Sequence, residues 1–356
     1  MNIKNLLLKA IIQGRVISRK KYRRNQNKQR LSTSDILTKE QIDSVKKYWS
    51  PFYKHVPIDD FKFYTTRTGV FSTKYIPDLI ASAYIYTRLN DPLKAEFLDD
   101  KNYYDMFFHD IEQPKTILRR KEKCFLDSNY CMIDIERSIN LCKLEGNVII
   151  KASRASNGGH GISFWSYLEQ SDEELREILT RHDDIVVQEV VAQHENLARL
   201  HPASLNTIRL ITLNHEKIGV KCLSSMLRFG ANNSKVDNCS SGGMCCGITE
   251  SGRLKAVAFD ILGRKEYKHL DTGVAFLDIT VPSFDKIQEL VLRLHDRFPE
   301  FGLLSWDIVV KKDGTPMLIE FNIDDGDVGL LQLNNGPLFG EYTDLILSEV
   351  FNKKRK

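Results

Sequence analysis

The stretch from Leu303 to Gly329 constrains the fold and the chemistry of this chain more than any other. Two apolar runs, 303–310 and 316–321, flank a polar turn that contains Asp313-Gly314, and this arrangement is typical of a β-hairpin. Three oxygen-bearing side chains stand within or directly after the apolar runs: Asp307, Glu320 and Asn322. The hairpin therefore carries polar groups where its strands should be buried.

These three side chains can meet on one face of the hairpin. Glu320 and Asn322 stand two positions apart, so they project from the same face of their strand, and Asp307 can lie opposite them. A carboxylate inside an apolar strand is costly without a partner, and hard oxygen ligands suit Mg²⁺ or Mn²⁺. The pattern predicts a metal site. The alternative is a half-exposed hairpin with chance polar positions.

The composition of the 356 residues is that of an ordinary globular protein with two or three compact lobes. We find no apolar run long enough to span a bilayer and no cleavable signal pattern near the first residue. The seven cysteines include no CxxC pair, and their odd number argues against a disulfide framework. These observations predict a reducing, cytoplasmic location.

The net charge of +4 conceals an asymmetry along the chain. Residues 1–30 carry ten Lys or Arg and no Asp or Glu, so the other 326 residues sum to −6. A mildly acidic body speaks against general binding of nucleic acid. Apolar residues at near-helical spacing predict a basic amphipathic helix over 2–20, followed by a polar linker at 19–32. Its basic face can be solvated while the helix packs on the body, or residues 1–30 can attach peripherally to the inner face of a membrane.

The chain divides into three predicted parts. Residues 1–32 form the basic arm and linker. Residues 33–96 form a helical region, in which Thr38 to Gln41 has the pattern of a capping box. Residues 97–352 mix strand and helix patterns and carry the polar motifs, so the function should lie in that part.

A glycine-rich loop follows the buried strand Val148–Ile150. Lys151 ends this strand, and the residues that give the loop its flexibility and its hydrogen-bond donors are Ser153, Ser156, Gly158, Gly159 and Gly161. Such a loop can fold over phosphates with its backbone N–H groups, while the lysine supplies a point charge. It matches neither a Walker A loop nor a Rossmann fingerprint, because a strand follows it. An ordinary flexible turn is the alternative.

Further residues can bind the same phosphate-bearing ligand. Lys101 follows two acids at a helix start and can reach a phosphate, although a surface lysine would look the same. The strand at 184–191 exposes backbone groups for an adenine edge around Gln188, Glu189 and Val191. Glu195, a few residues on, can accept from ribose hydroxyls or can be a surface acid.

Two arginines and a polar loop point to a bound anion. Arg209 lies inside an apolar strand and needs an anionic partner, which a ligand or a structural acid can supply. Arg228 ends the next strand. In the glycine-bearing segment 231–249, Asn238 and Ser241 can face an anion, unless the segment is merely a mobile loop.

The order of these features resembles the ATP-grasp family, and more narrowly the sugar-transfer-associated ATP-grasp proteins of bacterial polysaccharide loci. The resemblance rests on four motifs: Asp100-Lys101, His201–Arg209 (HPASLNTIR), Val236–Gly243 (VDNCSSGG) and Ser305–Gln332 (SWD, IEFN, DG and LQ in turn). It covers roughly residues 60–340. After Asn322 the chain reads Ile-Asp-Asp-Gly-Asp, where many ATP-grasp ligases have a Pro-Gly loop, so the amine site does not transfer.

The resemblance implies an α+β fold in which two lobes sandwich ATP, preceded by a reduced helical N-terminal region. The ATP-grasp domain would be 97–352, with the small lobe at about 145–190 and the large lobe at about 200–352. Lys101 and Lys151 would hold the phosphates, the glycine-rich loop would close over them, and the hairpin would hold one or two Mg²⁺.

The resemblance also implies a reaction. A carboxylate attacks the γ-phosphate of ATP, ADP leaves, and an amine then displaces phosphate from the acyl phosphate. Arg228 and Arg209, with Asn238 and Ser241 nearby, would neutralise the anion. The substrates would be a uronic acid and an amine, or an amino acid and a sugar, in capsule or O-antigen biosynthesis. Two alternatives remain open: an ATP-dependent phosphotransferase, and a nucleotide-binding scaffold at the membrane.

Overall fold

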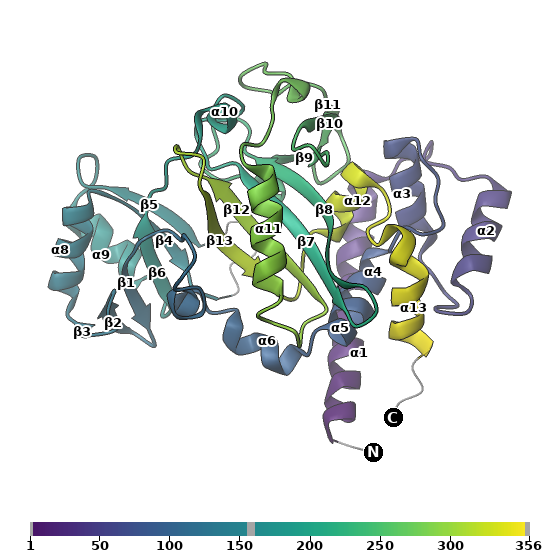
Figure 1. The fold of residues 1–356 in the computed structure, drawn as a ribbon, viewed down its shortest axis with the longest axis horizontal. Helices are drawn as coiled ribbons and strands as arrows, with labels where there is room; N and C mark the ends of the chain where they lie inside the picture. Colours follow the sequence, from purple (N-terminus) through teal and green to yellow (C-terminus); the bar gives the residue numbers. More distant parts are fainter. Residues whose placement is uncertain (1–2, 155–160, 353–356) are drawn as a thin grey trace.

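The computed structural model describes residues 3–154 and 161–352. Three parts lie side by side in Figure 1: a small lobe with its own sheet, a large lobe with a longer sheet, and a helical part. Ser156, Gly158 and Gly159 of the predicted phosphate loop lie outside the described residues. Helices and antiparallel sheets occur together, as the predicted α+β class requires.

The small lobe is a six-stranded antiparallel sheet covered on one face by two helices (Figure 1). The strand order is β3-β2-β1-β6-β4-β5, and the bounds are β1 Thr116–Lys121, β2 Cys124–Asp127, β3 Met132–Ile133, β4 Asn147–Ala152, β5 Ile162–Ser166 and β6 Ile185–Glu189. Helices α8 (Ile135–Glu145) and α9 (Asp172–Thr180) pack on it. The sheet thus begins well before the predicted range of 145–190, because the hairpin of β1 and β2 pairs with β6.

Alternation along β4 assigns the two faces of this sheet. Val148 and Ile150 are buried against α8 and α9, while Ile149 and Lys151 face the opposite way, toward the large lobe. The sequence of β4 therefore builds a core on one side and presents a lysine on the other.

The large lobe is a seven-stranded antiparallel sheet in the order β11-β10-β9-β8-β7-β12-β13. The bounds are β7 Thr207–His215, β8 Gly219–Phe229, β9 Met244–Ile248, β10 Leu254–Phe259, β11 Lys265–Glu266, β12 Leu303–Val310 and β13 Pro316–Asn322. Helix α11 (Phe284–His295) covers one face (Figure 1), where Leu304, Trp306 and Ile308 are buried. The opposite face carries Ser305 and Asp307.

Part of that opposite face is covered by the helical part. It comprises α1 Ile3–Arg30, α2 Lys39–Trp49, α3 Ile58–Thr68, α4 Asp78–Ile80, the π-helical η1 Ala81–Tyr86, α5 Thr87–Leu89, and the C-terminal α12 Val328–Asn335 and α13 Thr343–Asn352. Its apolar core continues into Leu213 of β7 and Leu303 of β12. The Gln332 side chain accepts from Ile76 N (2.8 Å) and donates to Ile76 O (2.9 Å), which ties α12 to the residues before α4.

Short elements connect these parts. They are α6 Pro92–Leu98, η2 Lys101–Tyr103, α7 Tyr104–Phe107, α10 Glu195–Ala198, η4 Cys239–Ser241, η5 Phe276–Asp278 and η6 Gly340–Tyr342. Asp100 caps η2 by accepting from Asn102 N, and this turn presents Lys101 to the space between the lobes.

The predicted linker at 19–32 is wrong, because α1 continues without a break to Arg30. Ion pairs to the body stabilise its second half: Arg19 with Asp325 (2.8 Å), Arg23 with Asp78 (3.2 Å) and Arg30 with Asp60 (2.6 Å). The segment predicted to be a polar linker is rich in arginines, and these form ion pairs with aspartates of the body.

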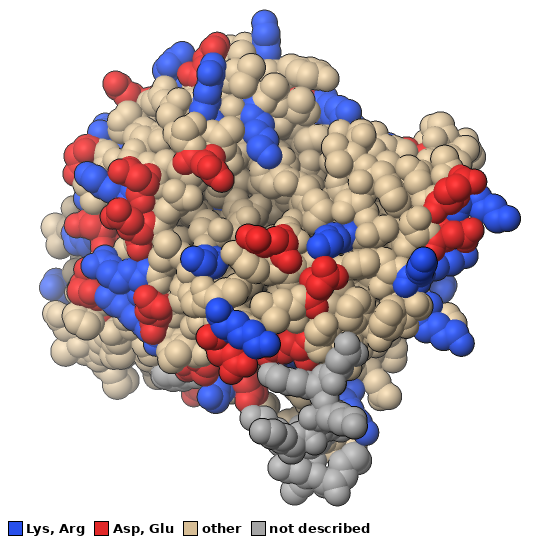
Figure 2. All heavy atoms as spheres, turned by 45° about the vertical axis from the view of Figure 1, so that its right-hand side comes forward, with Lys and Arg blue, Asp and Glu red and all other residues tan. Residues whose placement is uncertain are grey.

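Surface charge is mixed on the face shown in Figure 2. Lys and Arg side chains alternate there with Asp and Glu around a broad area that carries neither. That face lacks the uniform positive field that favours nucleic acid. Within the described residues, no helix combines the length and the apolar character needed to cross a bilayer.

Candidate active site

A cavity of about 660 Å³ lies between the two lobes and reaches α1. Residues from β4 and β5 line it on the small-lobe side, and residues from β7, β8, β12 and β13 line it on the large-lobe side. Its size suits a nucleotide with a second small molecule. The predicted residues that line it are Lys101, Lys151, Glu189, Val191, Arg209, Arg228, Asn238, Asp307, Glu320 and Asn322.

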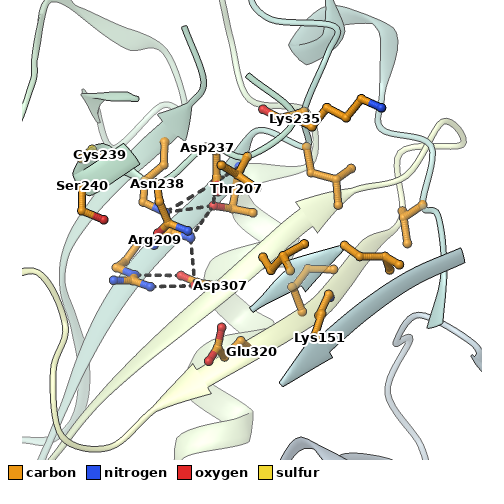
Figure 3. A pocket seen from close by; sticks show the side chains of 18 of the residues that line it. Lys151, Thr207, Arg209, Lys235, Asp237, Asn238, Cys239, Ser240, Asp307 and Glu320 are labelled. Atoms are coloured by element: carbon orange, nitrogen blue, oxygen red, sulfur yellow. Dashed lines mark hydrogen bonds and ion pairs between the residues drawn. The ribbon is translucent and has the colours of Figure 1, made fainter. Parts of the chain in front are cut away.

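A row of charges crosses three neighbouring strands on the floor of this cavity. Arg209 of β7 stands directly opposite Asp307 of β12, which stands directly opposite Glu320 of β13. Asn322 is paired with Ser305 one step along the same face. The hairpin is therefore present in the predicted register, with Asp307 across from Glu320 (Figure 3). Signs along the row run positive, negative, negative.

Asp307 is held by two arginines. Arg209 donates from Nε to Oδ1 (2.8 Å) and from Nη2 to Oδ2 (2.7 Å), which is the bidentate arrangement seen in Figure 3. Arg228 Nη2 donates to the same Oδ2 (3.1 Å). Burial by itself would raise the pKa of Asp307, but the charges of both arginines outweigh it, and the pKa lies below its ordinary value. Asp307 is therefore ionised although it is buried.

Three further residues complete this arginine cluster, and the sequence analysis did not select them. The Arg228 guanidinium donates to Thr207 Oγ1 (2.9 and 3.0 Å), and the Thr207 hydroxyl donates to Asp237. Arg209 Nη1 donates to Asp327. Asp237 directly precedes the predicted Asn238, and Asp327 ends the Asp-Asp-Gly-Asp segment. An acid next to a predicted motif was therefore the sequence signal that could have identified each of them.

Asp327 is fixed in an unusual backbone conformation. Its φ is +55°, in the left-handed region that residues other than glycine rarely adopt, and it precedes α12. The preceding Gly326 packs so closely that a Cβ there would overlap the hydroxyls of Ser305 and Tyr86. The Asp327 carboxylate is therefore placed by its backbone as well as by Arg209.

Two lysines from different elements point into the cavity. Lys101 Nζ lies 2.8 Å from Glu320 Oε1. Burial would lower the pKa of Lys101, but the charge and hydrogen bond of Glu320 raise it above its ordinary value. Among the described residues, Lys151 Nζ donates to the neutral amide oxygen of Gln188 (3.2 Å), and burial lowers its pKa to about 8. These lysines can hold phosphates, and they will respond differently to pH.

An apolar slot adjoins the lysines. Ile149, Ile162 and Phe164 line it from the small lobe, and Ile319 lines it from β13. Lys235 of the large lobe has its Nζ 5.8 Å from the centre of the Phe164 ring, so a cation–π contact crosses between the lobes. A planar base would be buried between apolar walls there.

Two histidines hold the loop that carries Asp237 and Asn238. A His201 ring nitrogen is hydrogen-bonded to Ser234 O (2.8 Å), and a His269 ring nitrogen is hydrogen-bonded to Gly230 O (2.9 Å). Both rings are buried. His201 opens the HPASLNTIR motif, and its role here is to fix the backbone before the arginine cluster.

Other predicted site residues lie elsewhere. Glu195 and Ser241 are exposed, and neither is among the described residues that line the cavity, where Ser240 stands in place of Ser241. Ser153 is buried and Gly161 has φ +82°, so both shape the ends of the loop without lining the cavity. Gln188 acts through Lys151. Glu195 is turned to solvent because α10 begins at it.

The far end of the cavity is closed by α1, which the sequence analysis left without a role there. Arg19 and Tyr22 line this end together with Asp325 and Leu330. Arg19 donates from Nη2 to Asp325 (2.8 Å) and from Nε to the Ser82 hydroxyl (3.0 Å). The cavity thus has a lysine-rich end with an apolar slot and an opposite end walled by α1.

The donor set at the hairpin fits a hard divalent cation. Asp307, Glu320 and Asn322 present carboxylate and amide oxygens from two paired strands. The Asn322 amide nitrogen is buried without a hydrogen-bond partner among the described residues, which leaves this side chain free to offer its oxygen elsewhere. Arg209, Arg228 and Lys101 neutralise the two carboxylates.

Comparisons with known proteins identify the family of this chain. A family model described as "Sugar-transfer associated ATP-grasp" matches residues 81–344. No curated protein sequence matches significantly. Among solved structures, the chain is similar to the VanG D-Ala:D-Ser ligase of Enterococcus faecalis, with 12% identity, a TM-score of 0.45, and coverage of 73% of this chain and 63% of that one.

Two further solved structures show a similar degree of likeness. The biotin carboxylase domain of the Hydrogenobacter thermophilus 2-oxoglutarate carboxylase, in complex with MgADP, ADP and bicarbonate, has 15% identity, a TM-score of 0.43, and coverage of 72% of this chain and 46% of that one. The ATP-grasp ligase PsnB, complexed with a minimal precursor, Mg and ADP, has 12% identity, a TM-score of 0.43, and coverage of 74% of this chain and 62% of that one. The chain thus spans about half to two thirds of these structures.

Proposed function

The chain belongs to the sugar-transfer associated ATP-grasp family, and on this premise we propose that it is an ATP-dependent carboxylate–amine ligase. Its substrates in this proposal are a uronic acid and an amine, or an amino acid and a sugar, in the cytoplasmic assembly of a capsule or O-antigen polysaccharide. One observation carries the proposal: a single cavity brings together the three oxygen-bearing side chains of the hairpin, two buried arginines from β7 and β8, and two lysines from η2 and β4.

The lysine-rich end is suited to the nucleotide. Phe164 and Ile319 would contact the base, and Lys101 with Lys151 would hold its phosphates. Asp307, Glu320 and Asn322 would hold Mg²⁺, which when bound neutralises the phosphate oxygens and orients the γ-phosphate. Positioning and charge neutralisation would then supply most of the rate enhancement.

The arginine cluster is suited to the anion that forms during the reaction. A carboxylate oxygen attacks the γ-phosphorus, the bond to the bridging oxygen breaks, and ADP leaves. Arg228 and Arg209 lie where they can hold the resulting acyl phosphate. The amine nitrogen then attacks the carbonyl carbon, inorganic phosphate leaves, and the nitrogen loses a proton. Closure of the lobes would exclude water, which otherwise hydrolyses the acyl phosphate.

The test is ADP release by the purified chain with Mg-ATP, across uronic acids crossed with amino acids and simple amines. Glu320→Gln removes a metal ligand and should abolish release, while Glu250→Gln, on an exposed turn, is the matched control. Release that needs both acid and amine supports the ligase. Release with acid alone and a stable phosphorylated product would instead establish a phosphotransferase. ATP binding without turnover across the panel would point to a nucleotide-binding scaffold.

A further inference from the structure

The outward face of α1 carries only positive charge. Seven of its exposed side chains lie on one side of a helix of about 40 Å, most of them three, four or seven residues apart, and they form one stripe: Leu6, Lys9, Ile17, Lys20, Lys21, Arg24 and Lys28. The 28 residues of α1 include no Asp or Glu. We call this set the α1 outer stripe.

The inward face of α1 is also basic, but its charges are used differently. Four arginines there are ion-paired with aspartates of the body: Arg15 with Asp324 (2.5 Å), Arg19 with Asp325 (2.8 Å), Arg23 with Asp78 (3.2 Å) and Arg30 with Asp60 (2.6 Å). Among the described residues, no ion pair involves Lys20, Lys21 or Lys28. The pairs fix the rotation of the helix, so the outer stripe faces solvent in one constant direction.

We propose that the α1 outer stripe binds the surface of an anionic lipid bilayer. Basic residues beside an anionic membrane strengthen binding about fivefold each, and the stripe presents five of them along one line. Leu6 and Ile17, which are 56% and 70% exposed, are apolar side chains that can enter the headgroup layer between the flexible lysine stems. Charge and apolar anchors together provide the two signals that stable peripheral binding needs.

Docking in this orientation has a consequence for the cavity. Arg19 and Tyr22 of the same helix line its far end, on the side opposite the lysine-rich end. A bilayer on the outer stripe would therefore lie across α1 from this end of the cavity, about one helix diameter away. On the proposed ligase function, this arrangement suits an acceptor that is carried on a lipid.

The experiment uses the full chain and sedimentation with vesicles. One set is phosphatidylcholine alone, and the other contains about 30% phosphatidylglycerol. The test variant carries Lys20→Gln, Lys21→Gln, Arg24→Gln and Lys28→Gln. The matched control removes four exposed charges from the large lobe, namely Lys217→Gln, Lys265→Gln, Lys286→Gln and Lys312→Gln. The substituted side chains of the test variant are partly or fully exposed, and thermal melting with and without Mg-ATP checks that both variants remain folded.

We expect the wild type to bind only the anionic vesicles, and to be released when NaCl rises from about 0.1 to 1 M, because screening shortens the Debye length about threefold. The test variant should bind at least roughly 100-fold more weakly, and the control within about threefold of wild type. Equal binding to both vesicle types would overturn the proposal, as would equal losses in the two variants. Release of the protein from the anionic vesicles by a short DNA duplex, added at the same total negative charge as the lipid, would assign the stripe to nucleic acid instead.

Discussion

Lys151 is the charged group of the cavity whose protonation should control nucleotide binding. It is the last residue but one of β4 and is partly buried, and among the described residues its ammonium group donates to the uncharged Gln188 side chain. The pKa of Lys151 is lowered to about 8, chiefly by burial; the charge of Glu320 opposes this shift, that of Lys101 adds to it, and that of Asp237 opposes it. Lys101 has the opposite shift, since Glu320 is 2.8 Å away. Above pH 8, therefore, Lys151 loses its charge while Lys101 keeps its own.

The magnitude follows from this pKa. If only the protonated form of Lys151 holds phosphate, the apparent Kd of Mg-ADP grows as one plus ten to the power of pH minus pKa. With a pKa of about 8 the Kd should change little up to pH 7 and rise about tenfold between pH 7 and pH 9. An ordinary lysine, with a pKa near 10.4, would leave the Kd almost constant over this range.

Isothermal titration calorimetry measures both the Kd and the protons taken up. Titrations in two buffers with different ionisation enthalpies should show an uptake of about 0.5 proton at pH 8 and about 0.9 at pH 9, as the bound phosphates recharge Lys151. Lys151→Met should bind more weakly and show neither effect, while Lys101→Met should keep both. A Kd that stays constant to pH 9 in the wild type would refute the reasoning, and so would equal pH dependence in Lys151→Met.

Three substitutions test other parts of the site. Arg209→Met should lower the free energy of unfolding in urea by about 3–5 kcal/mol, because it leaves the buried Asp307 carboxylate without its bidentate partner. The double variant Arg209→Met with Asp307→Leu should recover most of this stability but no activity. A double variant as unstable as the single one would contradict the ion-pair account. Arg19→Ala should raise the KM of the second substrate roughly tenfold at constant KM for ATP, whereas Arg24→Ala should change neither. Gly326→Ala should cost about 1–3 kcal/mol and slow turnover by displacing Asp327, which an unchanged melting temperature would exclude.

Local pattern in the sequence was enough to predict the hairpin on the floor of the cavity. The hairpin of β12 and β13 forms with Asp307 opposite Glu320, because period-2 alternation and the Asp-Gly turn determine strand pairing over a short distance. The resemblance to sugar-transfer associated ATP-grasp proteins is confirmed by the match over residues 81–344. Arg209 was predicted to need an anion, and the structure supplies Asp307 and Asp327.

The linker prediction was wrong because it could not take account of contact between residues distant in sequence. The part of α1 read as a linker is helical because Arg19, Arg23 and Arg30 meet carboxylates from distant segments, and local polarity cannot reveal that. Glu195 and Ser241 were chosen from position in a polar segment, but the turns at α10 and η4 direct them to solvent. Side-chain direction in irregular segments depends on such turns, whereas in strands it follows from spacing.

The pairing of the charges predicts that metal and nucleotide bind together. Arg209 is paired with Asp307 and Lys101 with Glu320, so two of the cations that should hold phosphate groups occupy carboxylates that should hold metal. ADP without Mg²⁺ would have to separate these pairs and leave carboxylates uncompensated, and Mg²⁺ without nucleotide would strand the cations. Mg-ADP supplies Mg²⁺ for the carboxylates and phosphates for the cations. Replacing the ion pairs by these contacts keeps the local charge nearly constant.

We therefore expect ADP to bind on the order of 100-fold more tightly with Mg²⁺ than in EDTA, which lies within the range of ordinary coupling energies. Lys101→Met frees Glu320 from its competing cation, so Mg²⁺ alone should bind this variant more tightly than wild type and the coupling should shrink. Calorimetry of each ligand, with and without the other, measures both quantities. Coupling of equal size in wild type and Lys101→Met would show that the Lys101–Glu320 pair does not link the two ligands.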